Sequence, residues 1–356
     1  MRRVILWACV AGVLAGCEPG EPAAGDKPRR DGFATDRELP RGDDPKRPKF
    51  AEDRDPKKGD PKAEVKVEFD GERAVKHVKE LCDIGPRISG SDGMKKQQEL
   101  LVKHFEDLGG KVSKQEFEAK QKSRKAAVGM TNLVVSWFPE RKTRVILCAH
   151  YDTRPQADQE ASERNWNKPF ASANDGTSGV AFLMELARHM KDLPTAVGVD
   201  FVLFDGEEYV FTGPLGEDEY FFGSKHFADE YKKAAKTRKH TYTAAVLFDL
   251  CFHDGANLKV EDHSWDGAKQ LVIDLWGIAE SRKAKSFKFL RGFDRGTAVL
   301  DDHVALLGVG IPAVDVIDFD YAHWHKLSDT PDKISAKQMT EVAGVIVQWL
   351  GGLKEK

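Results

Sequence analysis

The feature that most constrains this chain is a series of short apolar runs that alternate with segments of helical periodicity. The runs that read as strands are 131–137, 144–149, 199–204, 244–248, 287–290 and 311–316. Apolar residues at helical spacing occur in 72–83, 92–108, 177–190, 264–283 and 335–353. Short apolar strands separated by helices predict an α/β fold: a three-layer sandwich with helices on both faces of a central mixed, largely parallel β-sheet.

The N-terminus has the pattern of an export signal. A basic start, Met1 to Arg3, precedes an apolar run, 4–16, that is too short to span a bilayer as a helix. The run ends in Leu-Ala-Gly-Cys, which resembles the lipobox of bacterial lipoproteins. That resemblance implies lipidation of Cys17 and an exported protein anchored to a membrane of the bacterial cell envelope, on the periplasmic side or the cell surface. The alternative is an ordinary signal peptide with an incidental cysteine.

The next segment, 18–63, is rich in Pro, Gly, Asp, Lys and Arg, and its large apolar residues are Phe33, Leu39 and Phe50. Such a composition cannot bury enough surface to offset the entropy of ordering, so we expect a disordered tether. Binding of a partner by its charges is the alternative. The folded domain is predicted to comprise 64–356.

Neither the charge balance nor the cysteine spacing indicates a nucleic-acid-binding protein or a protein with CxxC motifs. The 58 acidic and 55 basic residues nearly cancel, for a net charge of −3, and this balance does not indicate nucleic-acid binding. After removal of the signal, Cys82, Cys148 and Cys251 remain; three cannot all pair, and none has a CxxC spacing. Because Cys148 and Cys251 lie in apolar runs, we expect buried free thiols there.

Polar residues gather at the ends of the predicted strands. Binding sites in such sheets form at the carboxyl ends of the strands. The residues at these ends, or in loops beside them, are His150 and Asp152, Asn174 and Asp175, Glu207 and Glu208, Asp249, and His323 to His325; Asp315 lies inside the last strand.

Histidine and carboxylate ligands suit zinc. Asp175, Glu208 and His325 could form one site, and His150 and Asp249 could form a second with Asp175 as the bridge. Glu207 would then stand beside a ligand as a general acid/base. Each residue alone has a structural explanation, such as a helix N-cap for Asp175. Together, at successive strand ends of one domain, they predict a zinc site.

The order of motifs resembles the zinc aminopeptidase and glutaminyl cyclase superfamily over about residues 70–353. The motifs are HYDT, SANDGTSGVAFLMELAR, FDGEE, FGSKHFA, LFDL, DDH and HWHKLSDT, with IGPRISGSDG upstream. The resemblance implies zinc bound by Asp175, Glu208 and His325, proton transfer by Glu207, and a substrate that is a peptide with a free N-terminus.

Several features favour the cyclase branch, which uses one zinc to convert N-terminal glutamine to pyroglutamate with release of ammonia. They are the insertion YVFTGPLGEDEYF, the DDH motif beginning at Asp301, and Trp324 before His325. In cyclases the first aspartate of DDH shares a hydrogen-bond network with the general acid/base, a role that the resemblance gives to Asp301. Asp249 and Asp301 are also expected to raise the pKa of Glu207 by like charge. The tryptophan packs against the substrate. Two departures are Asp315, where animal cyclases have histidine, and Gly213, where they have tryptophan.

Two alternatives remain. An aminopeptidase of the same superfamily would hold two zinc ions, with His150 and Asp249 as ligands of the second, and would hydrolyse the N-terminal residue from peptides. A catalytically inactive binding module on a lipid tether is the other. The oligomeric state is not indicated by the sequence.

Overall fold

The computed structural model describes residues 65, 67–211, 218–288 and 298–355. The predicted signal peptide with Cys17, the predicted tether and the insertion residue Gly213 lie outside these residues and stay predictions. Among the residues that the structure describes, no helix is long and apolar enough to cross a membrane.

Six strands form the central sheet in the order β1-β2-β4-β3-β5-β8. Their bounds are Lys111–Ala119 (β1), Val128–Trp137 (β2), Thr143–His150 (β3), Gly198–Phe204 (β4), Thr241–Asp249 (β5) and Ala313–Ile317 (β8). β4, β3, β5 and β8 are parallel to one another, whereas β1 and β2 form an antiparallel hairpin at one edge. The sheet is therefore mixed and largely parallel, as predicted. A separate pair, β6 (Leu258–Lys259) and β7 (Phe287–Lys288), lies outside it.

Alternation of side chains along the strands builds a core on each face of the sheet. In β4, Val199, Phe201 and Leu203 enter one core, and Val202 and Phe204 enter the other. Because both faces are apolar, both need a covering layer of helices.

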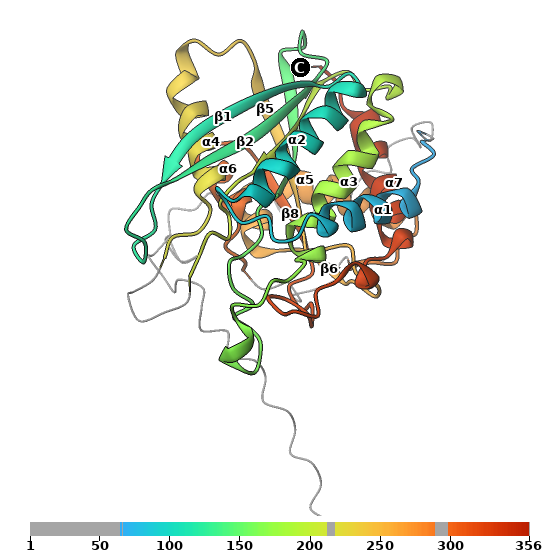
Figure 1. Cartoon of the computed structure of the whole chain (residues 1–356). Coiled ribbons are helices and arrows are strands. Elements are labelled where there is room, and N and C mark those ends of the chain that lie inside the picture. The colour runs from blue at the N-terminus through green and yellow to red at the C-terminus, as the bar shows by residue number, and fades with distance from the viewer. Residues whose placement is uncertain (1–64, 66, 212–217, 289–297, 356) are drawn as a thin grey trace, which may run out of the picture. The chain divides into compact units, whose positions relative to one another are not determined.

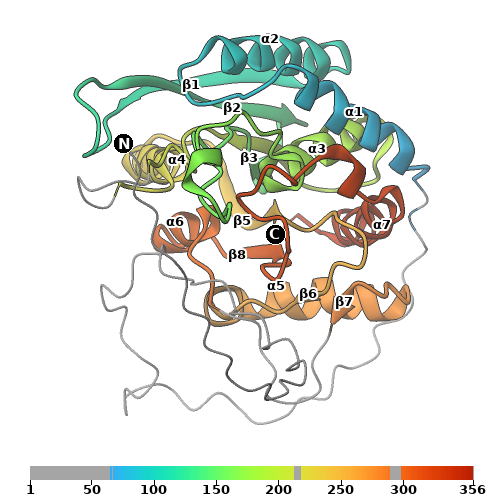
Figure 2. The same cartoon turned by 60° about the horizontal axis from the view of Figure 1, so that its bottom comes forward.

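Seven α-helices supply these layers within the described residues: α1 (Gly71–Asp83), α2 (Asp92–Asp107), α3 (Ser178–Ala187), α4 (Phe222–Lys233), α5 (Asp262–Ser281), α6 (Asp302–Gly308) and α7 (Ala336–Gly352). Side chains of α1, α2, α3, α5 and α7 join the larger core, and those of α4 and α6 join the smaller one. Figure 2 shows α4 and α6 on one side of β3, β5 and β8, with α3 and α7 on the other. The three-layer sandwich is confirmed.

Cys148 and Cys251 are buried free thiols, as predicted, and Cys82 is a partly buried one. Burial raises the pKa of all three thiols. Among the described residues, these three cysteines therefore contribute packing and no cross-link.

A buried carboxylate fixes α1 against α3. Glu185 of α3 is fully buried and accepts hydrogen bonds from Arg73 Nε at 2.7 Å, Arg73 Nη2 at 2.6 Å and the backbone amide of Asp70 at 3.2 Å. Burial opposes ionisation, but His189 and Arg73 outweigh it and lower the pKa of Glu185 to about 2. The ionised form is thus bound more tightly in the folded state than in the unfolded chain.

We expect Glu185→Gln to lower the free energy of unfolding at pH 7 by about 2 kcal/mol. Because the pKa is depressed on folding, this stabilisation is complete above the ordinary pKa of 4.5 and is lost as the pH falls toward 2. The difference between variant and wild type, measured by urea unfolding, should therefore shrink between pH 5 and pH 2.

The matched control is Glu230→Gln, which removes the exposed ion pair between Glu230 and Lys233 on α4. It should leave stability almost unchanged. A Glu185→Gln difference that stayed constant with pH would contradict this account of the buried carboxylate.

Candidate metal centre

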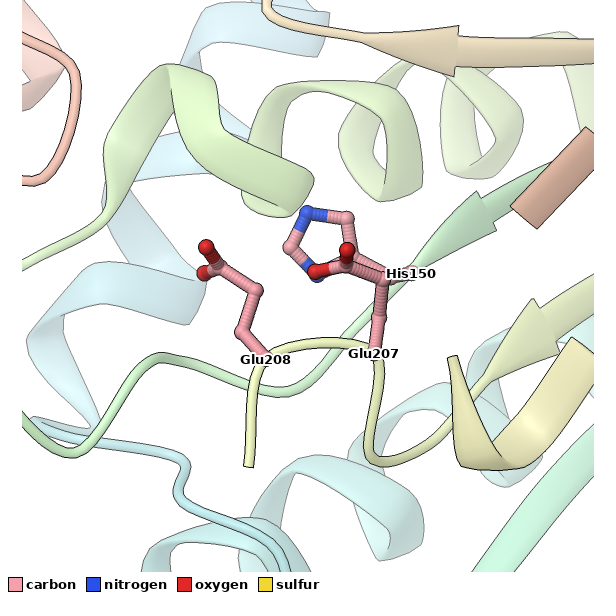
Figure 3. A group of neighbouring side chains, drawn as sticks. All are labelled: His150, Glu207 and Glu208. Carbon is pink, nitrogen blue, oxygen red and sulfur yellow. The ribbon is translucent and has the colours of Figure 1, made fainter. Parts of the chain in front are cut away.

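Three parallel strands deliver polar side chains to one edge of the sheet. His150 is the last residue of β3, Asp249 is the last residue of β5, and Glu207 and Glu208 follow the end of β4. All four are buried, with exposures of 1%, 8%, 8% and 3% respectively. Figure 3 shows both glutamates beside His150, with the Glu207 carboxylate against the imidazole ring. Neither glutamate is therefore a solvated residue at a strand exit.

One carboxylate holds the glutamate pair in place. The oxygens of Asp152 accept hydrogen bonds from the backbone amides of Glu207 and Glu208, each at 3.1 Å. The turn before the pair needs a glycine, because Gly206 has φ +74° and a Cβ there would lie 2.4 Å from the sulfur of Met130. The chain therefore leaves β4 sharply and presents two consecutive carboxylates to the same buried space.

A second carboxylate holds the turn that carries Asp175. Asp329 accepts hydrogen bonds from the backbone amides of Asn174 at 2.9 Å and Asp175 at 3.2 Å. The N-cap of α3 is Thr177, so the Asp175 side chain does not cap that helix. The Asp175 side chain is therefore available as a metal ligand, and its Oδ2 atom is buried with no hydrogen-bond partner.

Asp175, Glu208 and His325 place ligand atoms within 4.8 Å of one another. His325 Nε2 lies 2.6 Å from Glu208 Oε1 and 3.7 Å from Asp175 Oδ2. Glu208 Oε2 is also buried without a hydrogen-bond partner. A buried carboxylate oxygen with no donor is unfavourable unless a cation satisfies it. Two such oxygens beside an imidazole nitrogen fit a zinc ion.

His150, Asp175 and Asp249 form a second such group. His150 Nε2 lies 3.2 Å from Asp175 Oδ1 and 3.4 Å from Asp249 Oδ1. Asp175 belongs to both groups, which is the arrangement of a bridging ligand. The other ring nitrogen of His150, Nδ1, lies 3.8 Å from Glu207 Oε2.

The charges of the site act on the pKa of each carboxyl. Burial raises the pKa of Glu207 well above its ordinary value; His150 opposes this shift, and the charges of Glu208 and Asp301 add to it. Burial and Asp175 likewise raise the pKa of Glu208. Burial opposes ionisation of Asp175, yet its contact with His150 and the charge of His325 hold its pKa below the ordinary value. Asp175 is therefore the strongest anion of the group.

Asp301 and Asp315 are buried carboxyls that belong to none of the candidate metal groups. Asp301 caps α6, accepting a hydrogen bond from the backbone amide of Asp302 at 2.6 Å, and burial together with Asp249 raises its pKa. Asp315 is in the middle of β8, buried, with Oδ2 3.9 Å from His303 Nδ1. Asp301 acts on Glu207 through its charge.

Trp324 packs against the ring of the candidate ligand His325. Its ring centroid is 3.9 Å from that of His325 and 5.1 Å from that of Phe319. Behind these rings is a small apolar cluster of Leu250, Val299, Ile317 and Tyr321. The half-buried indole of Trp324 therefore packs directly beside the candidate ligand His325.

Several residues support the site from distant loops, and their contacts were not predicted from the sequence. Asp329 holds Asp175 across 154 positions, and Asp158 approaches His325 across 167. Gln121, fully buried in the loop between β1 and β2, donates to the carbonyls of Tyr209 and Glu219, both at 2.6 Å. It also accepts from the amide of Glu219 at 2.8 Å, so it closes the base of the loop that follows the glutamate pair. Local sequence carries no signal for such contacts.

A comparison with protein families agrees with this geometry. Residues 132–350 match the model of Peptidase family M28. That range contains His150, Asp175, the glutamate pair, Asp249 and His325.

The chain is also similar to solved structures and to curated proteins. It is 60% identical to the Fimbriiglobus ruber glutaminyl cyclase, with a TM-score of 0.79 over 82% of this chain and 97% of that one. It is 27% identical to a leucine aminopeptidase precursor from Bacteroides thetaiotaomicron, with a TM-score of 0.72 over 81% and 99%. The glutaminyl-peptide cyclotransferase of Bos taurus is 23% identical over 57% of this chain and 61% of its own length. The match thus spans less than two thirds of the bovine protein.

Gly176→Ala should damage the site and the fold together. A Cβ at Gly176 would lie 2.5 Å from Cε1 of His150, and φ is +71°. We expect a loss of about 2 kcal/mol in the free energy of unfolding, from strain and overpacking. Urea unfolding measures it, with Gly277→Ala as control. Gly277 is exposed in α5 with nothing within 4 Å of a new Cβ, so that variant should be as stable as wild type or more so. Equal stability of the two variants would contradict the close approach at Gly176.

Proposed function

The chain belongs to peptidase family M28, and within this family we propose that it is a zinc-dependent glutaminyl-peptide cyclotransferase. Such an enzyme converts the N-terminal glutamine of a peptide to pyroglutamate and releases ammonia. The observation that carries the proposal is the 60% identity to the Fimbriiglobus ruber glutaminyl cyclase over 82% of this chain. The ligand set and the neighbouring Glu207 supply the chemistry that this reaction needs.

We propose a single zinc ion, held by Asp175, Glu208 and His325. When bound there, zinc supplies a Lewis acid that polarises the side-chain amide of the substrate. Three protein ligands leave a position open, which a catalytic site requires. His150 and Asp249 then act on the charge of the site rather than as ligands.

The residues of the chain perform the proton transfers. The α-amine of the substrate attacks its own side-chain amide carbon; a C–N bond forms, and the bond to the amide nitrogen breaks. Glu207 accepts the proton that the amine loses and returns it to the departing ammonia. Burial and like charge raise the pKa of Glu207, which brings it toward the pH at which a group can both take and give a proton. Asp301 contributes to that shift, and Asp249 raises the pKa of Asp301 in turn.

The indole of Trp324 gives the curled glutamine side chain an apolar surface to pack against, beside His325. Packing of this kind holds the amine near the amide carbon and excludes water from it. Exclusion of water favours cyclisation over hydrolysis of the amide.

A di-zinc aminopeptidase is the second candidate. The group of His150, Asp175 and Asp249 favours it, as does the 27% identity to the leucine aminopeptidase precursor. An inactive binding module is the third candidate, and the complete ligand set weighs against it.

We also propose that the enzyme is exported and anchored through lipid at Cys17 to a membrane of the bacterial cell envelope, on the periplasmic side or at the cell surface. The basic start, the short apolar run and the lipobox-like end of residues 1–17 support this proposal. Its substrates would then be peptides and proteins of the cell envelope or the surroundings.

The test of function is product analysis. The zinc-loaded protein is incubated with a short peptide that begins with glutamine, and with the same peptide beginning with alanine. We expect mass spectrometry to show loss of ammonia from the intact glutamine peptide, abolished by a chelator, and no change in the alanine peptide. Release of free glutamine and a shortened peptide would instead establish the aminopeptidase. Unchanged peptides would favour the binding module.

Variants separate the proton shuttle from the metal ligands. Glu207→Gln should bind zinc normally and lose about 10²-fold or more in kcat, because amide nitrogen cannot shuttle the proton. Glu208→Ala and His325→Ala should lose the metal as well. Metal content is measured on dialysed protein and kcat at saturating zinc. A Glu207→Gln protein with wild-type kcat would remove this mechanism.

A further inference from the structure

A buried chain of polar contacts leads from the surface to the candidate ligand His325. Tyr220, half-buried, contacts Nη2 of Arg154 at 3.1 Å, and the same nitrogen donates to Asp158 Oδ2 at 2.7 Å. The other oxygen of Asp158 lies 2.9 Å from Nδ1 of His325. The side chains of Arg154, Asp158 and His325 are only 3%, 9% and 3% exposed. Because all three side chains are almost fully buried, the folded structure holds these contacts in place.

The contact with Asp158 determines which ring nitrogen of His325 carries the hydrogen. A carboxylate paired with a guanidinium only accepts hydrogen bonds, so Nδ1 of His325 must donate. In the neutral imidazole, Nε2 then keeps its lone pair. That nitrogen is the one that faces Glu208 and Asp175. The tautomer that Asp158 selects is thus the tautomer that binds a metal.

The backbone of His325 has an uncommon conformation that neighbouring residues hold in place. Its φ is +53°, a left-handed conformation that is uncommon outside glycine. The segment with Asp158 contributes two further contacts: the amide of Gln159 donates to the carbonyl of His325 at 3.2 Å, and Glu160 Oε1 accepts from the amide of Leu327 at 3.0 Å. The loop from 154 to 160 therefore fixes both the backbone and the side chain of His325.

Arg154 keeps Asp158 compatible with the other anions of the site. Its Nη1 is buried without a hydrogen-bond partner and lies 3.8 Å from Oε1 of Glu208. Arg154 is thus a buried cation that lies between Asp158 and Glu208 and offsets negative charge at the support of His325.

We propose that Asp158 is a positioning residue for the metal, which orients His325 and fixes its tautomer, and that Arg154 holds and neutralises Asp158. This inference rests on the proposed zinc site and extends it to two residues of the loop between β3 and α3. Loss of a partner of this kind lowers metal affinity by about 10- to 100-fold in metalloproteins.

The test measures zinc affinity without any peptide. Zinc dissociation constants of the full-length protein are determined by competition with a chromophoric chelator, at fixed pH, for wild type, Asp158→Ala and Asp158→Asn. We expect the alanine variant to bind zinc about 10- to 100-fold more weakly. The asparagine variant should lose less, because its side-chain oxygen still accepts from Nδ1.

Two further measurements exclude a merely structural role. Circular dichroism and urea unfolding identify the variants that are folded; should the alanine variant not fold, the nearly isosteric Asp158→Asn carries the test. The visible spectrum of the Co²⁺-substituted protein should shift in the variants, since it reports the ligand geometry directly. Folded variants with the wild-type dissociation constant and an unchanged Co²⁺ spectrum would overturn the proposal.

The matched control is Asp107→Ala. Asp107 pairs with Lys103 at 2.7 Å and a spacing of four residues, as Asp158 does with Arg154, but on the exposed face of α2. Its zinc affinity should equal that of wild type. Because no reaction is measured, weak zinc binding by the Asp158 variants would support the inference even if the enzyme proved to be an aminopeptidase. A wild-type protein that bound no zinc would overturn the inference together with the metal site.

Discussion

The candidate site depends on the two hydrogen bonds by which Asp152 holds the amides of Glu207 and Glu208. Adjacent residues of an extended chain point to opposite sides, so a strand that simply continued would expose one of the two glutamates. With both amides bound to one carboxylate, and Gly206 turning the chain before them, both side chains enter the same buried space. A hydrogen bond to a charged acceptor contributes about 1.5–3 kcal/mol, so the two bonds to Asp152 stabilise this turn, which brings the two carboxyls together.

That repulsion explains the electrostatics of the site. Asp175, Glu207, Glu208 and Asp249 are all buried near one another, and only some of them can be anions at once. Asp175, beside two histidines, has a lowered pKa, whereas the pKa of each of the other three is raised. A cation among the ligands and a proton on Glu207 relieve the same repulsion. The metal site and the proton shuttle that we propose would thus both follow from one cluster of charge.

The sequence predicted best what depends on local pattern. The buried strands β3, β4 and β5 were recognisable as apolar runs, and the polar residues that end them, such as His150 and Asp249, followed from the position of their strands. The edge strand β1 was not recognised, because only one of its nine residues is buried and no apolar alternation results. Nor were α4 and α6 predicted.

The loop residues that support the site could not be predicted from the sequence, for a different reason. Asp158 is an ordinary acidic residue of a polar segment, and its importance arises only when the chain brings His325 against it. Asp329 belongs to the motif HWHKLSDT, but its contact with the turn at Asn174 was not predicted. No periodicity or spacing encodes a contact across more than 150 positions. A functional residue at a strand end can therefore be read from sequence far more readily than the residue that orients it.

The three hydrogen bonds of Gln121 fix the position of the base of a loop, whatever the number of residues in that loop. They tie both ends of the segment between Tyr209 and Glu219 to the hairpin of β1 and β2. Once the base of a loop is closed, added residues raise the entropy of closure only slowly. A change in the number of residues between Tyr209 and Glu219 should therefore leave the two glutamates where they are, as long as Gln121 is retained.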